Sequence, residues 1–426
     1  MKAKVGRPDA LPPGFRWLAY WGFCWMNRHP EVWRFIGAGL RRWPALSHVL
    51  PFAARRSAVQ QVLTRPKSFS NTSHAANLVA SDFLIGMDPG VTYDADRALF
   101  ASILGSLKVS VSTHADQEAQ RRIKLIRGSV GFDLIDDYLM WVVLSAIKLA
   151  FGPAFDGIVA GSRTVQPDEA TQRNYLREIR HVAAHLFAGW LAPQAVAQRA
   201  EVSAASLRSR IEKMIPVLQG AWSAAGSMPN EAIRRNAIGL AWVSHPVTAQ
   251  SGALAFQELL GRPGVYEELR KKAHALKDNV WTDTDFRKDV SDHVLELMRF
   301  RPVFPLLARE VPRATQYEAG ARKNAKCPAG SSLTVLSIAA SFDAHQRENI
   351  GEYCPGQLNK KDPEMKFMMF GYSKRRCPAK DHAVDMLTSA FIGLLTLPEL
   401  RWADPWGSRI VYDGPMISRM RLRIAP

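Results

Sequence analysis

One cysteine near the C-terminus, Cys377, restricts the possible folds of this chain more than any other residue. It lies in FGYSKRRCPAKDHAVDMLTSAFIGLLTLPEL, residues 370–400, between a basic segment and an amphipathic stretch. Pro378 suits the first position of a helix, and apolar residues then recur at helical spacing up to Leu397-Pro398. The sequence therefore predicts a helix over residues 378–395, with Cys377 at its N-terminus.

Four cations lie close to this cysteine in the sequence: Lys374, Arg375, Arg376 and Lys380. A helix N-terminus and neighbouring cations both lower the pKa of a thiol, so we expect Cys377 to ionise readily. A thiolate can be the axial ligand of a haem iron, and the cations can pair with the two haem carboxylates. Cys327 and Cys354 also precede prolines, but neither opens a helix with cations beside it. Cys377 is therefore the preferred iron ligand.

Length and composition are those of an ordinary globular protein. The chain has 426 residues, of which 47% are apolar and 22% charged. Because neither a linker nor a repeat divides the sequence, we expect a single domain over residues 1–426, with residues 1–45 as an aromatic and basic N-terminal arm. The four cysteines form neither a disulfide framework nor a zinc motif, which favours reduced thiols and a cytoplasmic protein.

The net charge of +17 favours acidic partners. The sequence contains no helix-turn-helix, zinc-finger or RNA-binding signature, so we expect no nucleic-acid partner. The apolar run WLAYWGFCWM, residues 17–26, is shorter than the roughly 20 residues that a transmembrane helix needs. Its tryptophans and the nearby arginines would suit peripheral contact with a membrane surface, and simple packing under the N-terminal arm is the alternative.

Apolar periodicity predicts a mainly α-helical fold with a small β component. The expected helices cover residues 138–151, 171–190, 204–225, 230–260, 265–276, 286–300 and 378–395. Strands are expected near residues 48–52 and 331–340, within a region rich in proline and glycine that extends from 301 to 366.

The Cys377 segment resembles the haem-binding loop of the cytochrome P450 family. That loop reads Phe, two residues, Gly, one residue, Arg or His, one residue, Cys, one residue, Gly. Phe370 and Arg375 match in register, whereas Ser373 and Ala379 stand at the two glycine positions. The resemblance implies the cytochrome P450 fold and haem b (iron protoporphyrin IX), with Cys377 as the metal ligand and Phe370 and Arg375 as haem-binding residues.

The stretch DHVLELMRFRPVFPLLARE, residues 292–310, resembles a second element of that family. Glu296 and Arg299 are three residues apart, as in the family's Glu-x-x-Arg helix. Arg309 matches the arginine that follows that helix, which implies that it binds a haem propionate. Residues 353–358 match the segment that supplies a third polar residue, with Gln357 where the family has arginine, and an amide would hold Glu296 more weakly.

The N-terminal half agrees with the family in outline. Residues 55–71 resemble the strand and helix that precede the family's substrate-facing loop. In GMDPGVTYDADRALF, residues 86–100, Tyr93 and Arg97 keep the spacing of a histidine and an arginine that bind a propionate. The alternative for both is an exposed helix face. The substrate pocket is expected between the distal helix and the loop 70–83, whose small and apolar residues indicate a hydrophobic small-molecule substrate.

Residues 238–264 resemble the family's distal helix but lack its acid–alcohol pair. Counted without gaps, the acid falls on Pro246 and the threonine on Val247, and neither side chain can relay a proton. A kink at Pro246 would bring His245 or Thr248 over the iron and preserve monooxygenation through a non-standard proton relay. The alternative for His245 is an imidazole packed into the core.

Two other interpretations remain open. Peroxygenases of the family carry Arg-Pro at this point, similar to His245-Pro246 shifted by one residue, and members that rearrange fatty-acid hydroperoxides have a cysteine motif similar to residues 377–381. A fatty acid or its hydroperoxide would then be the substrate. The third interpretation is a non-catalytic haem binder.

For monooxygenation, the resemblance implies a ferredoxin or flavoprotein electron donor that docks on Lys374, Arg376 and Lys380.

Overall fold

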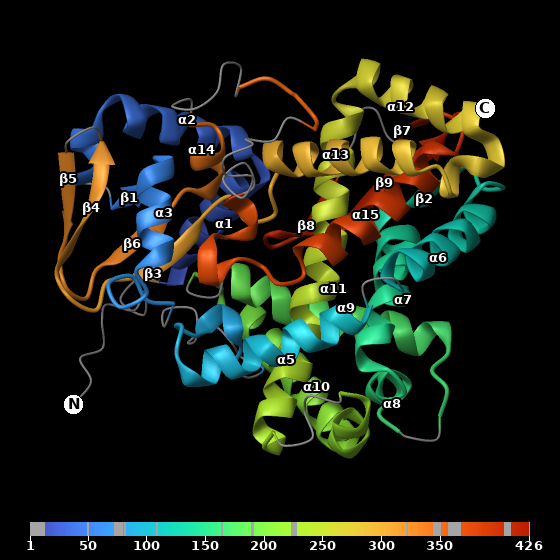
Figure 1. The fold of residues 1–426 in the computed structure, drawn as a ribbon, viewed down its shortest axis with the longest axis horizontal. Helices are drawn as coiled ribbons and strands as arrows, with labels where there is room; N and C mark the ends of the chain where they lie inside the picture. The colour runs from blue at the N-terminus through green and yellow to red at the C-terminus, as the bar shows by residue number, and fades with distance from the viewer. Residues whose placement is uncertain are drawn as a thin grey trace.

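Helices make up most of the structure, and short strands form small sheets in two regions of it (Figure 1). The computed structural model describes residues 13–48, 51–71, 80, 82–107, 110–162, 165–188, 191–222, 228–320, 323–343, 351–356, 368–403 and 410–425. The α-helices are α1 (Pro13–Arg28), α2 (Pro30–Arg42), α3 (Arg56–Thr64), α5 (Val91–Leu107), α6 (Ser110–Ile126), α7 (Met140–Phe151), α8 (Ala154–Ala160), α9 (Glu169–Ala188), α10 (Gln194–Ala221), α11 (Asn230–Leu260), α12 (Pro263–Leu276), α13 (Thr284–Phe300), α14 (Ser337–Ser341) and α15 (Lys380–Leu395).

The strands are β1 (Phe52–Ala53), β2 (Gly131–Asp133), β3 (Leu307–Glu310), β4 (Thr315–Gly320), β5 (Lys323–Cys327), β6 (Ser332–Val335), β7 (Leu400–Trp402), β8 (Ile410–Asp413) and β9 (Met416–Ile424). One sheet has the order β1-β6-β3, with β1 parallel and β3 antiparallel to β6. A second sheet has the order β2-β9-β7, and β8 pairs with β9 as an antiparallel hairpin. β4 and β5 form a separate antiparallel pair.

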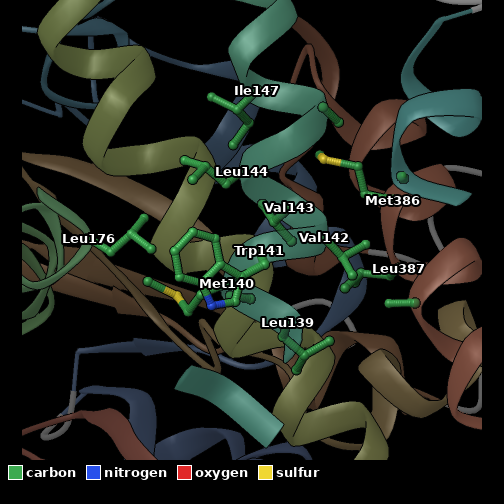
Figure 2. Close-up of a cluster of buried hydrophobic side chains, with 14 of the residues drawn as sticks. Leu139, Met140, Trp141, Val142, Val143, Leu144, Ile147, Leu176, Met386 and Leu387 are labelled. Atoms are coloured by element: carbon green, nitrogen blue, oxygen red, sulfur yellow. The ribbon is translucent and has the colours of Figure 1, made fainter. Parts of the chain in front are cut away.

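The helix α7 lies inside the main hydrophobic core (Figure 2). Its sequence MWVVLSAIKLAF is apolar almost all round, as expected for a helix that is covered on every side. Figure 2 shows Leu176 of α9 on one side of it and Met386 and Leu387 of α15 on the other. The core therefore connects α15, which follows Cys377, to the centre of the molecule.

The 31-residue helix α11 runs through the middle of the molecule (Figure 1). It packs against α7, α9, α10, α13 and α15. A Cβ at Gly252 would lie 2.7 Å from Leu387 Cδ2, so glycine at this position allows α11 to approach α15 closely. The helix continues through Pro246, which has no N–H to donate to the carbonyl of Trp242.

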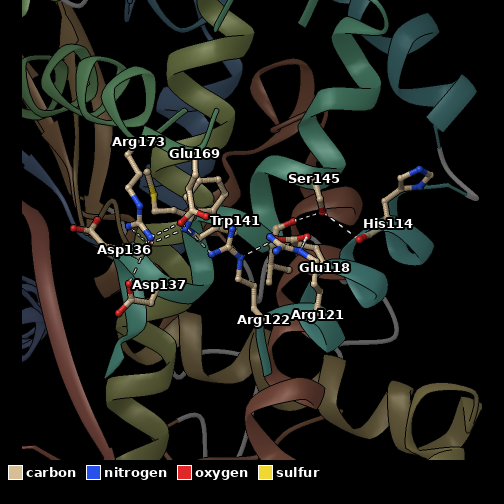
Figure 3. A network of polar contacts seen from close by, with 12 residues as sticks. His114, Glu118, Arg121, Arg122, Asp136, Asp137, Trp141, Ser145, Glu169 and Arg173 are labelled. Atoms are coloured by element: carbon tan, nitrogen blue, oxygen red, sulfur yellow. Dashed lines mark hydrogen bonds and ion pairs between the residues drawn. The ribbon is translucent and has the colours of Figure 1, made fainter. Parts of the chain in front are cut away.

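A polar network covers the outer side of α7 (Figure 3). The guanidinium of Arg122 lies 3.9 Å from the ring centroid of Trp141, and that of Arg173 lies 5.2 Å from the same ring. Arg122 also pairs with Glu118 at 2.8 Å, and Arg173 pairs with Glu169 at 2.7 Å. The network ties α6 and α9 to α7.

The expected mainly α-helical fold with a small β component is confirmed. The expected long helices correspond to α7, α9, α10, α11, α12, α13 and α15, although α10 begins at Gln194 rather than at residue 204. Residues 189–190 and 223–225 of two expected helices lie outside the described residues. Periodicity predicted none of α1, α2, α5, α6 or α8. The strand expected over residues 331–340 ends at Val335 and is followed by α14.

Candidate functional site

The chain before Cys377 turns back on itself through two residues with positive φ. Gly371 has φ +78° and Ser373 has φ +56°. A Cβ at Gly371 would lie 2.6 Å from the carbonyl oxygen of Arg375, so only glycine fits there. The turn allows the backbone N–H of Cys377 to donate to the carbonyl of Phe370 at 2.7 Å. Ser373, at the family's first glycine position, thus adopts a conformation that favours glycine.

Cys377 lies three residues before the first residue of α15, which is Lys380. The expectation that the helix begins at Pro378 is wrong, because Pro378 and Ala379 form a turn instead. Ala379 is the residue that precedes the first helical turn, and its carbonyl accepts from the N–H of Ala383 at 2.9 Å. The thiol is therefore near the N-terminus of α15 but outside the helix.

The prediction that Cys377 has a lowered pKa is also wrong for the polypeptide alone. Burial raises the pKa of Cys377 above its ordinary value. The backbone N–H of Ala379 and the guanidinium groups of Arg97 and Arg376 lower it, but by less than burial raises it. A metal ion can still bind such a thiol, because coordination displaces its proton.

A cavity of about 440 Å³ lies beside Cys377, between α5 and the cysteine loop. It is lined by Arg97, Ala101, Leu104, Gly105, Ser373, Arg376, Cys377, Pro378 and His382. His382 shares a hydrogen bond of 2.9 Å with the carbonyl of Leu104, which joins α15 to α5 at this cavity. The candidate iron ligand thus borders open space.

Tyr93 and Arg97 lie one turn apart on α5 and both contact the cysteine loop. The Tyr93 hydroxyl donates to the carbonyl of Lys374 at 2.7 Å, and Arg97 Nη1 donates to the carbonyl of Arg376 at 3.0 Å. Tyr93 is buried rather than exposed, which excludes the alternative of an exposed helix face for that residue. The structure therefore brings both residues to the candidate ligand, where they hold its loop against α5.

Arg375 of the cysteine loop pairs with Asp88, which lies just before α5. Its Nη2 lies 2.7 Å from Asp88 Oδ1, and its Nη1 donates to Asn71 Oδ1 at 3.0 Å. The backbone N–H of Asn71 and the hydroxyl of Ser70 also donate to the Asp88 carboxylate. The Nε atom of Arg375 is buried and has no hydrogen-bond partner. Asp88 and Asn71 were not predicted as site residues, although Asp88 lies in the sequence Asp-Pro-Gly shortly before Tyr93.

Arg309 of β3 is buried near this pair. Burial, and then the positive charge of Arg375, lower the pKa of its guanidinium to about 9, while Asp88 acts in the opposite direction. An additional carboxylate at this point would stabilise the charged form of Arg309 and supply an acceptor near Arg375 Nε. The two arginines therefore fit an anionic group such as a haem propionate.

Glu296 and Arg299 form a fully buried pair on α13. Arg299 Nη2 and Nε lie 2.6 and 3.1 Å from the two Glu296 oxygens, and the side chains are 0% and 2% exposed. The backbone N–H of Cys354 donates to Glu296 at 3.0 Å, and Arg299 donates to the carbonyl of Glu352 at 3.0 Å. The segment expected to supply the third polar residue thus reaches this pair, while Gln357 lies outside the described residues.

His245 is held in the core by α7. Its Nε2 lies 2.7 Å from the carbonyl oxygen of Met140, and its Nδ1 is buried without a partner. Burial lowers the pKa of its imidazole to about 4. This position agrees with the alternative of an imidazole packed in the core and does not support the expected proton relay. Thr248, one turn later on α11, is buried as well.

Part of the expected substrate-facing loop can be placed. Residues 72–79 and 81 lie outside the described residues, but Phe83 packs directly on α11. A Cβ at Gly239 would lie 2.0 Å from the Phe83 ring, and the ring centroids of Phe83 and Trp242 are 6.1 Å apart. Trp242 Nε1 is buried without a hydrogen-bond partner. The end of the loop therefore packs on the distal helix, and the expected substrate pocket between the two stays a prediction.

No family model matches the sequence, and no curated protein matches it significantly. Solved structures match along nearly the whole chain. The ligand-free cytochrome P450 TbtJ1 matches with a TM-score of 0.69, over 92% of this chain and 97% of that chain, at 14% identity. CYP164A2 from Mycobacterium smegmatis matches with a TM-score of 0.65, over 88% of this chain and 90% of that chain, at 17% identity.

The chain has the cytochrome P450 fold. A third match is P450BioI in complex with an acyl carrier protein that bears hexadec-9Z-enoic acid, with a TM-score of 0.66 and 14% identity, over 88% of this chain and 91% of that chain. At these identities the matches establish the fold alone. The resemblance found in the sequence is thus confirmed at the level of the cytochrome P450 fold.

Proposed function

We propose that this protein is a haem-thiolate oxidoreductase of the cytochrome P450 class, formed by residues 1–426 as one haem domain. The observation that carries the proposal is the position of Cys377, in a reversed loop beside a cavity and near the N-terminus of α15. A sulfur ligand and a set of arginines around one loop match the chemistry of an iron porphyrin with two carboxylates. The cytochrome P450 fold supports the same cofactor.

Each residue at the site has a proposed role toward the haem. Cys377 is the metal ligand, and Phe370 packs beside it. Arg309 and Arg375 bind one propionate, because both are buried and Arg375 Nε needs an acceptor. Tyr93 and Arg97 are proposed to bind the other propionate, in exchange for their present contacts with loop carbonyls. When bound, the haem supplies the oxidative chemistry, and these side chains orient it.

The substrate is proposed to be a hydrophobic small molecule, such as a fatty acid. The apolar packing of Phe83 and Trp242 at the expected pocket supports this class. Among the structural matches, one contains a carrier-bound fatty acid and another, P450 EryK, contains erythromycin B. Because matches of this one fold contain such different molecules, the fold alone does not select the substrate.

The proposed reaction is monooxygenation, with electrons from an acidic ferredoxin or a flavoprotein. Lys374 is exposed and Arg376 and Lys380 are half-buried around the candidate ligand, and such a surface would attract an acidic donor. Thr248 is the proposed proton-relaying group. His245 is assigned to structure, since its Nε2 is committed to the carbonyl of Met140.

A peroxide-dependent reaction is the second candidate. The contact between His245 and the carbonyl of Met140 favours this candidate, because it holds the imidazole against α7. Pro246 and Val247 cannot transfer protons, so the expected proton relay is reduced to Thr248. A substrate that already contains the O–O bond would not require electron delivery. The substrate would be a fatty-acid hydroperoxide alone, or a fatty acid together with hydrogen peroxide as the oxidant.

The haem-loaded protein should be given a fatty acid with a reduced ferredoxin system, the same fatty acid with hydrogen peroxide, and a fatty-acid hydroperoxide alone. Product only with the ferredoxin system supports monooxygenation, and Thr248→Val should then lower the product formed per electron while His245→Gln leaves it unchanged. Product without electrons supports the second candidate. A thiolate-type spectrum without turnover in any arm would overturn the enzymatic proposal and indicate a haem binder.

A further inference from the structure

The N-terminal helix α1 has one face fixed to the protein. Tyr20, Phe23 and Cys24 are at most 8% exposed and pack against Leu191 and Ala192, which connect α9 to α10. This buried face accounts for how α1 is attached to the rest of the chain. It also leaves the other side of the helix facing outward.

The outward face of α1 is almost entirely apolar and aromatic. Leu18 is 72% exposed, and Trp17, Trp21 and Trp25 are each about half exposed, with values of 45, 48 and 52%. Phe15, at 57%, extends the same face toward the start of the helix. Trp17 and Trp21 stack on one another, with ring centroids 6.3 Å apart. Single exposed apolar residues are common on proteins, but five within one short helix form a patch that marks an interaction surface.

The patch is held in a fixed position. Arg28, the last residue of α1, donates to the carbonyl of Gly414 at 2.9 Å. The guanidinium of Arg28 also lies 4.3 Å from the ring centroid of Tyr412 and 5.7 Å from that of Trp21. These contacts anchor the helix to the β8–β9 hairpin. The apolar face is therefore presented by the folded protein and is not a frayed end.

The sequence of α1 and of the residues before it is basic, which favours an anionic partner. The helix contains no aspartate or glutamate, and it includes Arg16 and Arg28. The residues that precede it in the sequence carry Lys2, Lys4 and Arg7 against one acid, Asp9. The whole chain has a net charge of +17. Basic residues next to a tryptophan-rich face are the composition of helices that lie in the surface of an anionic bilayer.

Tryptophan itself favours lipid over a dry protein interface as the occupant. An indole has a large apolar body and one N–H donor, so it prefers the boundary between acyl chains and headgroups, where water and phosphate oxygens accept from that donor. Among the helices of the described residues, none is long and apolar enough to cross a bilayer. The suitable geometry is therefore a helix that lies flat in the membrane surface.

We propose that α1 is a membrane-surface anchor, with Phe15, Trp17, Leu18, Trp21 and Trp25 inserted into one leaflet of an anionic bilayer. Apolar insertion and the attraction of the basic residues to lipid phosphates act together. The binding therefore requires both the exposed aromatic face and anionic lipid. It does not require haem, so its failure and the failure of the proposed function are distinguishable.

Vesicle co-sedimentation tests this proposal with the full chain. Vesicles of phosphatidylcholine alone are compared with vesicles that contain one quarter phosphatidylglycerol, at low and high salt. We expect binding to the anionic vesicles, weaker binding at high salt, and quenching of tryptophan fluorescence by brominated acyl chains. The variant Leu18→Ser/Trp21→Ser/Trp25→Ser should lose at least about tenfold in affinity, because its apolar face is removed.

The matched control is Leu125→Ser/Val130→Ser/Val202→Ser, which removes three exposed apolar side chains at 62, 87 and 72% exposure that lie outside α1. It should bind vesicles like the wild type, and both variants should keep the wild-type circular dichroism. Wild-type protein that fails to bind anionic vesicles would overturn the proposal. So would an α1 variant that binds as well as the wild type. A stable dimer that only the α1 variant abolishes, without vesicle binding, would assign the patch to a second copy of the chain instead.

Discussion

Arg375, two residues before the candidate iron ligand, pairs with Asp88 of the turn before α5, with 2.7 Å between Nη2 and Oδ1. The side chain of Arg375 is 4% exposed and that of Asp88 is 29% exposed. The pair joins the cysteine loop to a segment almost three hundred residues earlier in the chain. It places an internal carboxylate next to the arginine that is proposed to bind a propionate.

Asp88→Asn should destabilise the protein, because a buried guanidinium then loses its charged partner. We expect a loss of about 3 kcal/mol in the free energy of unfolding, measured by urea denaturation. The control is Glu399→Gln, which breaks an exposed pair with Arg401 and should cause no comparable loss. Equal effects of the two substitutions would contradict a special role for the Asp88 pair.

Glu296→Gln should destabilise the protein more than Asp88→Asn does. Both members of the Glu296–Arg299 pair are buried, and the carboxylate also accepts from the N–H of Cys354. The expected loss is about 3–5 kcal/mol in the free energy of unfolding. Lys288→Ala on the same helix breaks an exposed pair with Asp292 and serves as the matched control, with no measurable loss expected. If Glu296→Gln unfolds at the wild-type urea concentration, the pair does not hold this region together.

Ser373→Gly should stabilise the protein, because Ser373 has φ +56°, where a Cβ is unfavourable. The gain should be about 1 kcal/mol in the free energy of unfolding, and Ser373→Ala, which keeps the Cβ, should give no gain. Lys277→Gly relieves another positive φ, +51°, outside the cysteine loop, and should also increase the free energy of unfolding. A destabilised Ser373→Gly protein would show that the serine side chain has another role.

The buried His245 makes stability depend on pH. Its pKa is about 4 in the folded protein, below the unperturbed value near 6.5, so the unfolded chain binds the additional proton between these values. Its contribution is therefore complete above pH 6.5 and is lost as the pH falls toward 4, by roughly 3 kcal/mol in total. His245→Gln, which cannot titrate, should show a smaller decrease in unfolding free energy over this range. Identical pH profiles for the two proteins would contradict the buried, neutral imidazole.

The long central helices could be predicted from the sequence because their buried faces repeat at helical spacing. The apolar periodicity predicted a helix over residues 230–260, and α11 begins and ends at these residues, Asn230 and Leu260. By contrast, α6 has the largely polar sequence STHADQEAQ over residues 112–120 and becomes a stable helix through its packing on α7 and α15. The aromatic run 17–26 was expected to be part of an arm, and its helix depends on contacts with Leu191 and Ala192.

The candidate site could be predicted only in part, for a similar reason. Cys377 and Arg375 are recognisable because their neighbours in the sequence define the loop. The orientation of His245 is decided by the carbonyl of Met140, 105 residues earlier in the chain, and no local pattern contains that information. The pairing of Asp88 with Arg375 is a long-range contact of the same kind. The pKa of Cys377 depends on burial, which the cations in its sequence do not indicate.

The sulfur of Cys377 as the iron ligand is the central claim, and carbon monoxide binding tests it most directly. The purified protein, loaded with haem and reduced, should show with carbon monoxide the red-shifted absorption band that thiolate coordination gives. Cys377→Ser should lose this band, while Cys327→Ser and Cys354→Ser should keep it. A wild-type protein without the band, or a Cys377→Ser protein that retains it, would contradict the account.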